Sequence, residues 1–259
     1  MSDTGQIDYR HRTVAGCFVV TFSGRLDSRT YLEVRDSLVK LALEQPRALV
    51  VEMHGLEVAN DLQLSVFSSA WMRVSEWPDV PIMLVATDGT LHDRLKSSAL
   101  ARFVPVYANV DAAVASLKSP RLQRRNVMTY PPLPESSSAA RQFVRQTCHQ
   151  WDITPWTQDA LCVASELVEN AYQHTGTELE LRLELRRGLL TVAVRDGSPR
   201  PAVLRQRADG QPNGYGLQIV ADLARSWGCA PDLRGGKVVW AVLTCGTDWF
   251  RKYPAWPGP

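Results

Sequence analysis

The residues best suited to chemistry lie in one stretch, Ala164–Thr175, which reads ASELVENAYQHT. Glu166 and Asn170 stand four residues apart in it, so on a helix one lies a single turn above the other. A carboxylate and a carboxamide placed this way can supply a base and a ligand for a hard metal ion on one rigid element. The alternative is an ordinary amphipathic helix with a solvated polar face. An apolar stripe at helical spacing predicts the buried side, made by Ala164, Leu167, Val168 and Ala171.

Two further groups downstream could bind a ligand. Asp196 follows a predicted strand and falls on the same side as Val192 and Val194, so we expect it to face the helices. A carboxylate there is costly to desolvate unless a donor reaches it, and its alternative role is to stabilise a turn at the strand end. Gly214 and Gly216 precede a predicted helix, where backbone N–H groups can converge on phosphates. A flexible loop would explain these two glycines equally well.

The order and spacing of these motifs resemble the GHKL (Bergerat-fold) ATPases, and in particular the anti-sigma-factor serine kinases of bacteria. The similar segments are an N-box at Glu166–Ala171 (ELVENA), a first glycine box at Val194–Pro199 (VRDGSP), a second at Gly214–Leu217 (GYGL), and a closing strand at Gly235–Trp240 (GGKVVW). The resemblance implies ATP and Mg²⁺ as cofactors. It makes Glu166 the catalytic group that orients or deprotonates a serine hydroxyl, Asn170 the Mg²⁺ ligand, and Asp196 the acceptor for the exocyclic amine of adenine. The remaining ATP-binding positions that it implies are Gly197, Gly214, Gly216 and Leu217.

The first glycine box departs from the family pattern Asp-x-Gly-x-Gly. Ser198 and Arg200 stand where that pattern has its two glycines. We therefore expect the backbone to approach a nucleotide less closely, which bears on affinity more than on the identity of the pocket. Lys237 stands near a position where relatives contact the nucleotide, and the resemblance assigns it no role.

The first 118 residues alternate between predicted strands and helices, which predicts a mostly parallel sheet with helices packed on it. This order, together with Gly24–Asp27 (GRLD), resembles the STAS domain of anti-sigma-factor antagonists, in which a serine at a helix start is phosphorylated. Alignment on Val51–Leu56 places Asp61 at that serine, so the acceptor hydroxyl is missing. Asp61 is then either a fixed negative charge at the switch position or a helix cap. The expected strands are 14–22, 48–53, 81–86 and 104–107, and the expected helices are 28–44, 62–77, 90–101 and 110–117.

Composition narrows the classes of protein. The 259 residues are 45% hydrophobic and 22% charged, with a net charge of +2, which is typical of a soluble globular protein and gives nucleic-acid binding no electrostatic support. No apolar run approaches the ~18 residues that span a bilayer, and the polar start lacks a secretion signal. The five cysteines form no C-x-x-C pair and predict reduced thiols. We therefore expect a cytoplasmic protein without a membrane or nucleic-acid partner.

The expected fold is α/β throughout. It comprises a STAS-like domain with a mostly parallel sheet over residues 1–118, a basic, Pro- and Ser-rich linker over 119–137, a Bergerat-fold α/β two-layer sandwich over 138–245, and a tail over 246–259. The resemblance implies an ATP-dependent protein serine/threonine kinase in sigma-factor control. Its partner would be a sigma factor or a STAS-domain antagonist, and a homodimer is left open. The alternative is an ATP-binding interaction module without phosphoryl transfer; ATP hydrolysis by a larger GHKL machine is disfavoured because no transducer domain follows residue 245.

Overall fold

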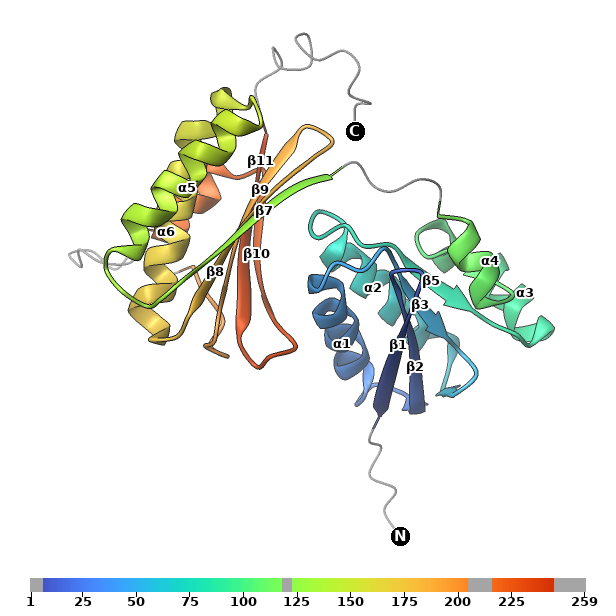
Figure 1. Cartoon of the computed structure of the whole chain (residues 1–259). Helices are drawn as coiled ribbons and strands as arrows, with labels where there is room; N and C mark the ends of the chain where they lie inside the picture. The colour runs from blue at the N-terminus through green and yellow to red at the C-terminus, as the bar shows by residue number, and fades with distance from the viewer. Residues whose placement is uncertain (1–6, 118–122, 205–215, 245–259) are drawn as a thin grey trace. The chain divides into compact units, whose positions relative to one another are not determined.

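The computed structural model describes residues 7–117, 123–204 and 216–244 (Figure 1). Contacts within the chain divide it into two compact units, Met1–Pro120 and Arg121–Pro259, which we call the N-terminal and the C-terminal unit. Each unit has its own sheet and its own buried core. The predicted tail, 246–259, lies outside the described residues.

The sheet of the N-terminal unit has the strand order β1-β2-β3-β5-β6, and the short strand β4 pairs with β2. The pairs β2–β3, β3–β5 and β5–β6 are parallel, whereas β1 and β2 form an antiparallel hairpin. The predicted parallel-rich sheet is therefore confirmed. Its strands are β1 (Asp8–Val14), β2 (Cys17–Leu26), β3 (Leu49–Glu52), β4 (Leu56–Val58), β5 (Ile82–Val85) and β6 (Val106–Tyr107).

The β1–β2 hairpin replaces the single strand expected over 14–22. Ala15 and Gly16 form its two-residue turn with φ values of 49° and 79°, in the left-handed region that such a turn requires. The residues of β1 are exposed up to Thr13. They therefore lack the apolar alternation that identifies a half-buried strand in a sequence.

Helices cover both faces of this sheet, as expected for parallel strands (Figure 1). Helix α4 packs on one face in a cluster with Val19, Val50 and Val85. Helix α1 contacts β2 and β3, and the alternate residues Val20 and Val51 are also fully buried. The helices are α1 (Tyr31–Leu43), α2 (Ser65–Val74), α3 (Gly89–Ser97) and α4 (Val110–Ala115), with 3₁₀ turns η1 (Asp61–Leu64) and η2 (Ala99–Arg102).

The C-terminal unit is an antiparallel five-stranded sheet in the order β10-β11-β9-β8-β7. Three helices, α5, α6 and α7, pack on one face of it (Figure 1). The elements are β7 (Gln123–Tyr130), α5 (Ser136–Gln150), η3 (Thr154–Trp156), α6 (Thr157–Thr175), β8 (Leu179–Arg186), β9 (Leu189–Asp196), α7 (Gly216–Leu223), β10 (Ser226–Pro231) and β11 (Lys237–Thr244).

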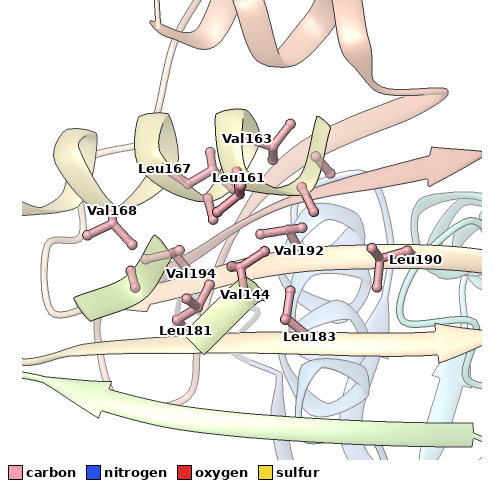
Figure 2. Close-up of a cluster of buried hydrophobic side chains, with 14 of the residues drawn as sticks. Val144, Leu161, Val163, Leu167, Val168, Leu181, Leu183, Leu190, Val192 and Val194 are labelled. Carbon is pink, nitrogen blue, oxygen red and sulfur yellow. The ribbon is translucent and has the colours of Figure 1, made fainter. Parts of the chain in front are cut away.

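The core of the C-terminal unit lies between the sheet and α6. Figure 2 shows Leu167 and Val168 of α6 directed toward Val194 and Leu181 on the strands. All four side chains are at most 1% exposed. The strict leucine alternation in β8 produces this arrangement, because every second side chain of a strand points to the same face.

The predicted linker over 119–137 is corrected by β7, which occupies Gln123–Tyr130 and pairs along its whole length with β8. Helix α5 also starts within the predicted linker, at Ser136. The basic residues of β7 suggested a solvated connection, but this is an edge strand, where charged side chains are common. Arg124 donates from Nη1 to the carbonyl of Trp151 at 3.0 Å, and Asn126 donates from Nδ2 to Thr147 Oγ1 at 2.9 Å. These contacts tie the strand to the end of α5.

Candidate functional site

Helix α6 carries Glu166 and Asn170, the predicted catalytic and metal-binding residues. Its apolar stripe is confirmed, because Ala164, Leu167, Val168 and Ala171 are all buried. Glu166 and Asn170 are half-buried on the helix, one turn apart. The helix ends at Thr175, with Gly176 as C-cap in the left-handed conformation at φ 60°.

The first residue of α7, Gly216, lies against Glu166. A Cβ atom at Gly216 would overlap the carboxylate oxygen Oε2 of Glu166, so any larger residue would displace that carboxylate. The N-terminus of α7 and the carboxylate therefore share one small space, and the following residue, Leu217, is buried in the core as an anchor for the helix. Gly214, the other glycine of the predicted second box, lies outside the described residues.

Burial also affects the proton affinity of Glu166. Partial desolvation raises the pKa of its carboxyl group, and the neighbouring Glu169 carboxylate raises it further. A raised pKa makes a carboxylate a better proton acceptor near neutral pH. The environment of Glu166 thus suits a general base.

Asp196 ends β9 on the helix-covered face, as predicted, and is only 3% exposed. Its Oδ1 accepts hydrogen bonds from the backbone N–H of Ser198 and from Lys237 Nζ, both at 2.8 Å. Its Oδ2 is buried and has no hydrogen-bond partner among the described residues. An acceptor left in that state costs free energy, and a donor group from a ligand would satisfy it.

Lys237 is the partner of Asp196 that sequence reasoning missed. The two residues face each other in the β9–β11 register, and Lys237 is also 3% exposed. The signal for this pairing is the register of β11, which places Val239 opposite Val194 and so brings Lys237 opposite Asp196. The donor that the buried carboxylate needs is therefore supplied in part by the chain itself.

Close backbone contacts surround Asp196. The N–H of Gly197 donates to Thr177 Oγ1 at 2.9 Å, which ties the end of β9 to the segment just after α6. A Cβ atom at Gly236 would overlap the carbonyl oxygen of Asp196, so only glycine fits there. Ser198 and Arg200, the departures from the glycine box, form a local turn in which the N–H of Arg200 donates to Ser198 Oγ at 3.3 Å.

The predicted site residues of the C-terminal unit come from three elements, β9, α6 and α7. The end of β9 contributes Asp196 and Gly197, and α6 and α7 contribute Glu166, Asn170 and Gly216. Contacts join α6 to β9, β11 and α7. Among these groups, Asp196 Oδ2 is an open acceptor for a donor group of a ligand, and Gly216 leaves the space beside it to the Glu166 carboxylate.

Asp61, the predicted switch position, belongs to the N-terminal unit. It is the first residue of η1, its side chain is 68% exposed, and it pairs with Arg94 at 3.5 Å. The helix cap is Asn60, whose side chain accepts a hydrogen bond from the N–H of Leu62 at 3.0 Å. Capping by Asp61, the alternative reading of this residue, is therefore wrong, and its carboxylate is free of the cap.

Two other kinds of feature are absent from the part of the chain that the structure describes. Among the described residues, no group of three or more His, Cys, Asp or Glu side chains could hold a metal ion. Within the same ranges, no helix combines the length and the apolar character that a bilayer crossing demands.

Comparison with known families identifies residues 8–113 as a STAS domain. Similar solved structures include an anti-sigma factor antagonist from Mycobacterium paratuberculosis, with 18% identity over 46% of this chain and 100% of that one and a TM-score of 0.38. A STAS domain protein from Planctomyces limnophilus has 18% identity over 42% of this chain and 97% of its own, with a TM-score of 0.35. The phosphorylated form of the Bacillus cell fate determinant SpoIIAA has 15% identity over 43% of this chain and 100% of its own, with a TM-score of 0.31. No curated protein matches the chain, and the family match does not extend into the C-terminal unit.

Proposed function

We propose that this protein is an ATP-binding regulatory factor of the anti-sigma type, whose C-terminal unit is a protein serine kinase acting on a STAS-type antagonist. The observation that carries the proposal is the buried Asp196 carboxylate with one unsatisfied oxygen at the end of β9. The motifs of the GHKL ATPases around it, from Glu166–Ala171 to Gly235–Trp240, support a Bergerat fold for this unit.

In this proposal, each candidate residue of the C-terminal unit has a role in nucleotide binding or in phosphoryl transfer. Asp196 accepts a hydrogen bond from the amine of the base, and the N–H groups at the start of α7, with Gly216, face the phosphates. Asn170 offers its carboxamide oxygen to Mg²⁺, a ligand type that this ion accepts. Glu166 orients or deprotonates the attacking serine hydroxyl, helped by its raised pKa. Bound Mg-ATP supplies the phosphoryl group to be transferred.

The STAS domain at residues 8–113 supports a place in sigma-factor control. The kinase resemblance of the other unit points in the same direction, because such kinases act on a serine of STAS antagonists. Asp61 occupies that serine's position here and carries no hydroxyl. The substrate is therefore a separate STAS protein, with a sigma factor as the other expected partner.

A second candidate is an ATP-binding interaction module that transfers no phosphoryl group. Two observations favour it: Ser198 and Arg200 replace glycines of the first box, and Asp61 presents an exposed permanent charge at the switch position. The two candidates differ in one measurement. Incubation of the protein with labelled ATP and purified STAS proteins gives a labelled serine only if the kinase proposal is right.

Nucleotide binding is tested first, by calorimetry with Mg-ATP on the full chain. We expect Asp196→Asn to weaken binding by roughly 1–3 kcal/mol, because the amide keeps its shape but presents a donor where the base amine needs an acceptor. Glu135→Gln, an exposed carboxylate-to-amide change in the same unit, is the control and should bind like the wild type. Absence of wild-type binding at millimolar ATP, or equal affinity in Asp196→Asn, would contradict the proposal.

A further inference from the structure

The ion pair between Lys237 and Asp196 places a donor and an acceptor side by side in the candidate site. Both side chains are about as buried as core residues, at 3% exposure for each residue, and Nζ lies 2.8 Å from Oδ1. Nothing in the GHKL resemblance assigns Lys237 a function. Its position next to the base-recognising carboxylate therefore raises the question of what the pair can recognise.

The hydrogen-bonding capacity of the pair is incompletely used. An ammonium group has three N–H donors, and the hydrogen bond of Lys237 to a described residue goes to Asp196 Oδ1. That oxygen also accepts from the Ser198 N–H, so both of its lone pairs are engaged. The acceptor that stays open within the described part of the chain is Oδ2. The pair thus offers a ligand one carboxylate oxygen and further ammonium N–H groups.

A carboxylate alone would select one kind of purine. It accepts from the amine at position 6 of adenine, but it repels the carbonyl oxygen at position 6 of hypoxanthine or guanine, because an ionised carboxylate only accepts hydrogen bonds. An ammonium group beside it removes that repulsion, since it can donate to the carbonyl oxygen. The carboxylate oxygen is then left for the N–H at position 1 of a 6-oxopurine. With a 6-aminopurine the same two groups serve the amine and the ring nitrogen N1.

We infer that Lys237 determines base specificity, so that the site accepts 6-oxopurine nucleotides as well as ATP. This inference rests on the proposed nucleotide site. A role confined to neutralising the buried Asp196 predicts something different: loss of Lys237 would then weaken all purine nucleotides to the same extent. The ratio of affinities for two bases therefore separates the two roles.

The test compares ATP with inosine triphosphate, because the two differ only in the base edge at positions 6 and 1. Calorimetry with Mg²⁺ on the full-length wild type should give dissociation constants within about tenfold of each other, a gap of at most ~1.4 kcal/mol. In Lys237→Met, which keeps an unbranched side chain only one atom shorter and without the charge, inosine triphosphate should lose about ten- to hundredfold relative to ATP, the value of one hydrogen bond to a charged group. Lys237→Arg keeps charge and donors and should preserve the wild-type ratio.

The outcomes separate this inference from the proposed function. If the wild type binds neither nucleotide, both are wrong. If it binds ATP but discriminates against inosine triphosphate by more than about tenfold, a gap of ~1.4 kcal/mol, only the inference fails. An unchanged ratio in Lys237→Met likewise overturns the inference alone. If Lys237→Met does not fold, the ratio of the dissociation constants for inosine triphosphate and ATP in the wild type and in Lys237→Arg still tests the inference.

Discussion

At the scale of single residues, Glu166 shows how a site residue acts against stability. Its folded-state pKa is raised by desolvation first and by Glu169 second, so the folded protein binds the proton of Glu166 more tightly than the unfolded chain does. The stability that this group contributes is fully present below its unfolded pKa of about 4.3 and is lost as the pH rises through the folded value. At neutral pH the ionised form is therefore a cost to the fold.

We expect Glu166→Gln to raise the free energy of unfolding at pH 8, and to raise it less at pH 5, because glutamine is neutral at both. Urea denaturation at the two pH values measures this difference.

The same Glu166→Gln variant should lose phosphotransfer by about 10²–10⁴-fold, the usual effect of removing a general base. Glu135→Gln serves as the exposed control. Full transfer activity in Glu166→Gln would show that the carboxylate is not the base.

The sequence predicted the placement of Glu166, Asn170 and Asp196, because helical and strand periodicity alone determine which face a residue occupies. It did not predict the Lys237 partner of Asp196. That contact depends on the register between β9 and β11, which are separated by about 40 residues in the chain. Periodicity within one element carries no information about such a register.

At the scale of elements, the β10–β11 hairpin positions the end of β9. Asp232 Oδ1 accepts hydrogen bonds from the N–H groups of Arg234 and Gly236, at 2.9 and 2.8 Å, and so shapes the turn. Asp232 Oδ2 also lies 3.2 Å from Arg195 Nε on β9. Gly236 then passes so close to the backbone of Asp196 that no side chain fits between them.

Gly236→Ala should therefore destabilise the protein by about 1–3 kcal/mol, the usual cost of overpacking, and should weaken nucleotide binding by shifting Asp196. The matched control is Gly89→Ala at the start of α3, where an added Cβ meets nothing within 4 Å. That control should be neutral or slightly stabilising. Urea denaturation of both variants provides the comparison, and equal stabilities would mean that the close approach at Gly236 is unimportant.

Most elements could be predicted, and the failures have physical causes. The long amphipathic helices and the alternating strand β8 can be recognised in the sequence from the spacing of their apolar residues. Strand β7 and strand β1 did not, because edge strands expose polar side chains and resemble linkers or loops in sequence. For that reason the predicted second domain starts too late, at 138, whereas the predicted end of the first domain, 118, lies two residues from the observed division after Pro120.

At the scale of the whole molecule, the chain combines a STAS domain with a second unit that has its own core. The C-terminal unit holds the candidate nucleotide site, and the STAS domain holds the candidate switch position at Asp61. A phosphoserine at such a position carries a charge of about −1.5 to −2 that can be added and removed, whereas an aspartate carries a constant charge of −1. The STAS domain of this chain is therefore expected to be held in one signalling state.

The final prediction is that the STAS domain gains no stable phosphate over residues 58–70 when the full chain is incubated with Mg-ATP. Ser65 is the exposed hydroxyl nearest in sequence to Asp61, but it donates to the carbonyl of Leu62 at 2.7 Å at the start of α2, so an attacking conformation would require that turn to open. Asp61→Ser should restore an acceptor, because the side chain at this position is mostly exposed at the start of η1. Asp61→Ala is the control and should stay unmodified. Intact-mass analysis with peptide mapping measures the phosphate on each variant. A stable phosphate on Ser65 of the wild type would contradict the prediction, because the phosphorylation site would then lie four residues from Asp61 and the STAS domain would not be held in one signalling state by the constant charge of Asp61.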